Sequence, residues 1–105
     1  MRHPASQSFV DRVTAWIELH DQKQQDYGKE GDPFANIRRV ERMKIPAWVG
    51  CVIRMADKMA RLEVAVEQYL TTGEVKLANE GVLDSFDDMG VYSGIGAVLF
   101  KEWSA

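Results

Sequence analysis

The stretch from Pro46 to Leu62 is the strongest constraint on the fold, because its apolar residues recur at the spacing of an α-helix. At about 100° per residue they share one wide arc, formed by Trp48, Val49, Val52, Ile53, Met55, Ala56, Met59, Ala60 and Leu62. The opposite arc holds Arg54, Asp57, Lys58 and Arg61. This pattern predicts a long amphipathic helix with its apolar arc toward a core.

Proline and glycine divide the remaining sequence into further helical segments. A first helix is expected from roughly Ser8 to Asp26, with His20 in its apolar stripe. Asp32-Pro33 predicts the capped start of a short helix ending near Arg42. The segment Thr71 to Asn79 is expected to connect to a last helix from about Glu80 to Lys101. We therefore predict an all-α fold, an antiparallel bundle of about four helices, in a single domain spanning residues 1–105.

Size and composition limit the classes of protein to consider. A chain of 105 residues is near the lower end of what buries a stable core, so we expect a homodimer or a larger homo-oligomer. The net charge of −3 disfavours polymeric nucleic acid as a partner. One cysteine, Cys51, excludes an intrachain disulfide, and the longest apolar-rich stretch, 91–100, is about half of a membrane span. These features favour a soluble cytoplasmic protein with no membrane partner.

The last helix carries the pattern that points to chemistry. Glu80, Asp84, Asp87 and Asp88 fall within about 100° on a helical projection, and the same face continues as Val91, Ile95 and Val98. A face that changes from acidic to apolar is expected to point inward, where clustered carboxylates repel one another and need a cation or basic side chains nearby. Mg²⁺ or Mn²⁺ prefers such oxygen ligands, with substrate phosphates completing the shell.

Structural explanations of the same residues remain open. Acidic residues are favoured in the first turns of a helix by its macrodipole. Arg54, Lys58 and Arg61 suit either an anionic ligand or a solvated face with ion pairs such as Asp57–Arg61. Tyr27 and Phe34 lie near a glycine-containing loop and suit either base stacking or core packing.

Four short blocks carry a resemblance to a known family. They are Tyr27-Gly28, Asp32-Pro-Phe-Ala-Asn36, Arg54-Met-Ala-Asp-Lys-Met-Ala-Arg61 and Asp84-Ser-Phe-Asp-Asp-Met-Gly-Val-Tyr92. In order and spacing they resemble small phage and prophage domains that are associated with nucleotide modification. Those domains are related to the all-α (MazG-like) nucleoside triphosphate pyrophosphohydrolases, and the resemblance spans roughly residues 27–103.

The resemblance implies a Mg²⁺-dependent protein that acts on or binds a (deoxy)nucleoside triphosphate and releases pyrophosphate if it is a hydrolase. Asp57, Glu80, Asp84 and Asp88 would hold the metal, with Asp84 and Asp88 catalytic. Arg54, Lys58 and Arg61 would contact phosphate, and Tyr27, Phe34 and Asn36 the base or sugar.

Two departures from the family pattern keep a second hypothesis open. The family's Glu-Glu-x-x-Glu motif is replaced by Asp57 among cations, and the second set of acids is spaced by four residues instead of three. The alternative is a non-catalytic phage helper that binds a nucleotide or a host protein, with the charged stripes as structural ion pairs.

Overall fold

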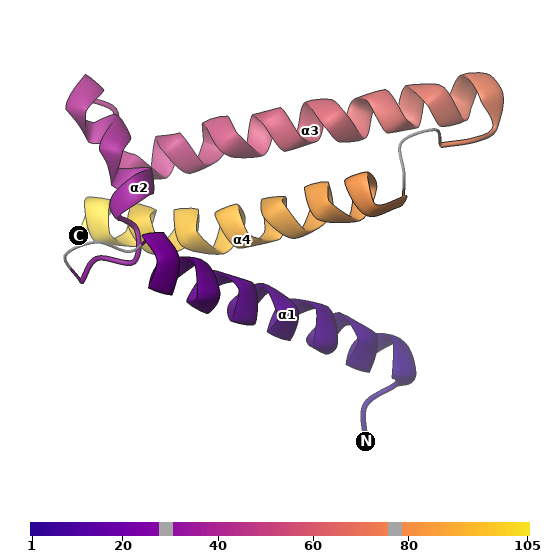
Figure 1. Cartoon of the computed structure of the whole chain (residues 1–105), viewed down its shortest axis with the longest axis horizontal. Helices are drawn as coiled ribbons and strands as arrows, with labels where there is room; N and C mark the ends of the chain where they lie inside the picture. Colours follow the sequence, from indigo (N-terminus) through magenta and orange to yellow (C-terminus); the bar gives the residue numbers. More distant parts are fainter. Residues whose placement is uncertain (28–30, 76–78) are drawn as a thin grey trace. The chain divides into compact units, whose positions relative to one another are not determined.

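A computed structural model describes the backbone of residues 1–27, 31–75 and 79–105, and the side chains of residues 1–22, 31–75 and 81–105. The described backbone contains α1 (Pro4–Tyr27), α2 (Ala35–Arg38), the 3₁₀ helix η1 (Arg39–Met43), α3 (Ala47–Thr72) and α4 (Asn79–Ser104), and no β-strand (Figure 1). The predicted all-α class is therefore confirmed. The chain divides into two compact units, residues 1–36 and 37–105. The prediction of one domain over the whole chain stays a prediction.

The first unit consists of α1 and the segment that leads into α2. The α1 helix is longer than expected, since it begins at Pro4 rather than near Ser8. Asp32 acts as predicted for a capping residue, because its Oδ1 accepts a hydrogen bond of 2.9 Å from the Phe34 backbone N–H. His20 and Phe34 form a tilted ring pair with centroids 5.8 Å apart. Both rings therefore pack within this unit.

The ends of α3 follow from local backbone chemistry. Pro46 occupies the N-cap position with ψ 143°, and its carbonyl accepts the Val49 N–H at 3.0 Å. At the other end Gly73 adopts φ 77°, a left-handed conformation that glycine takes without strain, and its N–H donates to the Tyr69 carbonyl at 2.8 Å. The helix thus starts where the proline predicts. It ends at Thr72, within the segment that was expected to begin the connection at Thr71.

The α3 and α4 helices form an antiparallel hairpin in the second unit (Figure 1). Cys51 near the start of α3 lies against Gly96 near the end of α4, whereas Lys58 further along α3 pairs with Asp88. A Cβ added at Gly96 would meet the Cys51 Cβ at 3.2 Å, so the missing side chain permits this close approach. The buried apolar residues of the described chain all lie on these two helices: Ala47, Cys51, Leu62, Ala65 and Leu99.

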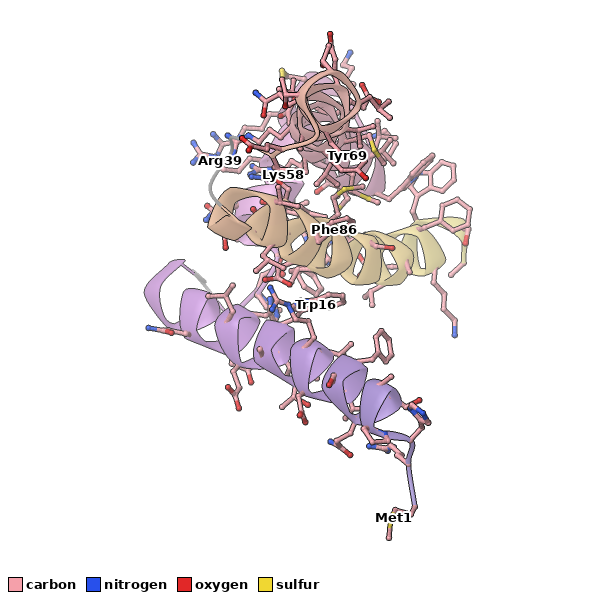
Figure 2. All side chains as sticks on the ribbon, turned by 90° about the vertical axis from the view of Figure 1, so that its right-hand side faces the viewer. Met1, Trp16, Arg39, Lys58, Tyr69 and Phe86 are labelled. Carbon is pink, nitrogen blue, oxygen red and sulfur yellow. The ribbon has the colours of Figure 1, made fainter. Side chains whose placement is uncertain are left out.

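The side of α3 that packs differs from the prediction. Five residues of the predicted core arc are exposed, namely Val52 at 53%, Ile53 at 50% and Met59 at 43%, together with Ala56 and Ala60. Lys58, from the predicted polar arc, lies half-buried between α3 and α4 (Figure 2). The physical reason is that one neighbouring helix covers only one side of a wide apolar arc.

The short helix η1 is fixed against the start of α3. A Cβ added at Gly50 would meet the Val40 Cγ2 at 3.0 Å, which shows how closely the two backbones approach. Lys44 ends η1 in a left-handed conformation with φ 62°. None of the described helices is long and apolar enough to cross a lipid bilayer.

Candidate functional site

An ion pair joins the two helices of the hairpin at its middle. The Lys58 Nζ lies 2.9 Å from the Asp88 Oδ2, and the side chains are 20% and 28% exposed. Partial burial reduces the screening of this pair by water and salt relative to a fully exposed one. The structure thus brings together one predicted phosphate contact and one predicted metal ligand, as partners of each other.

A second polar contact lies one turn away. The Arg54 Nη1–H donates to the Tyr92 hydroxyl oxygen at 3.4 Å, and the guanidinium carbon lies 5.7 Å from the centre of the Tyr92 ring. Such a cation–π contact orients the guanidinium group while leaving it exposed. We call the four residues Arg54, Lys58, Asp88 and Tyr92 the polar layer. Tyr92 was part of the resemblance, but the sequence assigned it no role.

The other predicted residues of α3 are exposed. Arg61 lies two turns beyond Arg54 on the same side of the helix, and Asp57 is exposed beside it. No ion pair joins Asp57 to Arg61 within the described side chains. The ion pair expected between these two residues, which are four positions apart, therefore does not form. Arg61 is therefore a solvent-accessible cation next to the polar layer.

The predicted acidic cluster is dispersed among the described side chains of α4. Asp84 is exposed, Asp87 is half-buried, and Asp88 pairs with Lys58, while the side chain of Glu80 lies outside the described residues. Among the described side chains, no three His, Cys, Asp or Glu residues gather as a metal site would require. The described acidic side chains of α4 do not form a Mg²⁺ site by themselves. The predicted set of metal ligands that includes Glu80 stays a prediction.

The residues predicted to contact the base or sugar belong to the first unit. Phe34 is half-buried and packs on His20, and Asn36 is exposed. The side chain of Tyr27 lies outside the described residues. The role of these three residues stays a prediction.

Burial changes the ionisation of the Cys51 thiol. Burial raises the pKa of the Cys51 thiol, and the nearby Arg54 charge lowers it by a smaller amount. The side chain is fully buried against Gly96. A buried thiol with a raised pKa is a poor nucleophile, so Cys51 is a packing residue.

An aromatic cluster and an ion pair close the hairpin at the end of α4. Trp48 lies 5.2 Å from Phe100 and 5.6 Å from Trp103 between ring centroids, and its buried Nε1 has no hydrogen-bond partner in the described residues. Arg38 binds both carboxylate oxygens of Glu102, at 2.9 and 3.1 Å. These contacts hold Arg38 and the start of α3 against α4, and the sequence did not predict the pairing across 64 residues.

Comparisons with known proteins give no match: no family model, no curated protein and no solved structure is significantly similar to this chain.

Proposed function

We propose that this protein binds the phosphates of a nucleotide on α3, without metal-dependent hydrolysis. The observation that carries the proposal is the position of Arg54 and Arg61, two exposed guanidinium groups about 10 Å apart along one side of a rigid helix. Arginine matches the oxygen geometry of phosphate and forms two hydrogen bonds to it. Tyr92 keeps the Arg54 group oriented before a ligand arrives.

Lys58 and Asp88 have a structural role in this proposal. Their ion pair joins α3 to α4 beneath the two arginines, so neither residue is available to a ligand unless the pair breaks. This favours the non-catalytic alternative, a phage or prophage helper in the bacterial cytoplasm that binds a nucleotide. In the same alternative, the partner is a host protein if it is not a nucleotide.

A Mg²⁺-dependent pyrophosphohydrolase is the second candidate function. Its support is the resemblance to the MazG-like family and the one-turn spacing of Glu80, Asp84 and Asp88 on α4.

Equilibrium titration with a fluorescent deoxynucleoside triphosphate, with Mg²⁺ and with EDTA, tests the proposal. Arg54→Gln and Arg61→Gln are each expected to weaken binding roughly tenfold, because each removes a charge-assisted contact to phosphate. Lys101→Gln removes an equal charge from an exposed position of α4 and is the matched control. Absence of nucleotide binding by the wild-type chain would refute the proposal. Pyrophosphate release that Asp84→Asn abolishes would establish the hydrolase instead.

We also propose that the helices assemble as a bundle with a second copy of the chain. Val52, Met59 and Val66 recur every seven residues along α3 and are exposed in the single chain. This spacing is typical of helices that pack on one another. Sedimentation equilibrium would measure the mass, and a monomer at all concentrations would contradict this part of the proposal.

A further inference from the structure

Charge is segregated along this chain more strongly than its net value indicates. Residues 37–62 hold seven of the 13 Lys and Arg residues but only two of the 16 Asp and Glu residues, a net charge of +5. The remaining residues carry −8. The overall charge of −3 therefore hides a basic region within an acidic protein, and such asymmetry is typical of a surface for a polyanion.

Part of this region forms one surface. On α3, Gly50, Arg54 and Arg61 fall within about 40° of one another at helical spacing. Val40 of η1 packs directly on Gly50, so η1 lies over the start of that side of the helix. In a 3₁₀ helix residues three apart share a face, which places Arg39 and Arg42 together.

The view along α3 agrees with this arrangement. Figure 2 shows Arg39 on the side of α3 where Lys58 lies, with nitrogen atoms gathered beside the helix there. We call Arg39, Arg42, Arg54 and Arg61 the basic face. All four are exposed, and no ion pair to a carboxylate holds any of them within the described part of the chain. Arg38, by contrast, is paired with Glu102 and does not belong to it.

We infer that the basic face binds the phosphodiester backbone of a polynucleotide. Four arginines on one rigid unit present a row of bidentate phosphate donors longer than a single nucleotide requires. Neighbouring like charges repel one another, and phosphate neutralisation relieves that repulsion with release of counterions. The inference rests on the proposed function, because Arg54 and Arg61 belong both to the proposed nucleotide site and to the basic face. Arg39 and Arg42 are specific to the longer ligand.

The test measures binding of a labelled 20-nucleotide single strand and of its duplex as a function of salt. Four phosphate contacts predict a slope of about −3 for log K against log salt on the single strand and about −3.6 on the duplex. Arg39→Gln is expected to weaken binding roughly three- to fivefold and to reduce the slope by about 0.7 on the single strand. Lys101→Gln, with the same loss of charge, is expected to change neither quantity, and Arg39→Lys to retain most of the binding.

Three outcomes would overturn the inference. They are no binding at low salt, an equal effect of Arg39→Gln and Lys101→Gln, or equally tight binding of polyglutamate, which would make an acidic protein the partner. The nucleotide titration separates this result from the proposed function. Arg39→Gln is expected to leave deoxynucleoside triphosphate binding unchanged, and polynucleotide binding that depends on Arg39 without any mononucleotide binding would refute only the proposed function.

Discussion

Two stretches of the α3–α4 contact hold the helices together by different means. At the apolar end, the small residues Cys51 and Gly96 let the backbones approach closely, and Leu99 is 2% exposed beside them. In the polar layer, the long side chains of Arg54 and Lys58 reach Tyr92 and Asp88 and remain partly exposed. The difference indicates that the apolar end contributes more to stability than the polar layer does, and that the polar layer is the part where a ligand can compete.

Truncation of Leu99 gives the largest expected effect. Leu99→Ala leaves a cavity in the apolar end and is expected to lower the free energy of unfolding by about 2–4 kcal/mol, measured by urea denaturation. Val98→Ala is the neighbouring control, since Val98 is 52% exposed and its truncation should change the free energy by less than about 1 kcal/mol. An equal loss of unfolding free energy in Leu99→Ala and Val98→Ala would contradict the view that the apolar end contributes more to stability than the polar layer.

The close approach at Gly96 is tested by adding one methyl group. Gly96→Ala places a Cβ 3.2 Å from the Cys51 Cβ and is expected to destabilise the protein by about 1–2 kcal/mol through overpacking. Gly94→Ala is the matched control, because a Cβ there meets nothing within 4 Å and should raise the stability by roughly 0.5–1 kcal/mol. If both variants melt at a higher temperature than the wild type, the helices do not touch at Gly96 in solution.

The ion pair of the polar layer should contribute less. Asp88→Asn leaves Lys58 half-buried without its carboxylate, and we expect a loss of about 1 kcal/mol in the free energy of unfolding. A double-mutant cycle with Lys58→Gln isolates the coupling between the two side chains, expected at about 0.5–1 kcal/mol. Asp84→Asn, at an exposed position, should change the stability by less than about 0.5 kcal/mol. Zero coupling would show that Lys58 and Asp88 are independent, and both would then be available to a ligand.

The smallest expected effect is a pH dependence that originates at Cys51. Burial raises the pKa of the thiol in the folded protein, so the unfolded chain loses this proton first as the pH rises. The folded state then binds more protons than the unfolded state, and stability falls between the ordinary thiol pKa and the higher pKa of the folded protein. The difference in unfolding free energy between wild type and Cys51→Ala should therefore shrink from pH 7 to pH 10. A constant difference would indicate that water reaches the thiol.

Much of the helical architecture could be predicted because its signals are local. Pro46 and the spacing of apolar residues located α3 closely, and Asp32 caps its own turn as expected. The start of α1 was placed four residues too late, since the large apolar residues of its stripe begin only at Phe9. Of the candidate site, the sequence placed Lys58 and Asp88 on charged stripes of two helices and kept structural ion pairs between the stripes open, but it did not specify that these two residues would pair.

The sequence alone determined that the chain is helical, because propensity, periodicity and capping act within a few residues of each position. Which side of α3 packs was decided only in three dimensions. Its apolar arc is wider than one helix can cover, and the small residues Cys51 and Gly96 selected the side with the closest backbone approach. That choice left Val52 and Met59 exposed and placed Lys58 beside Asp88, because contacts between distant segments depend on the fit of two surfaces.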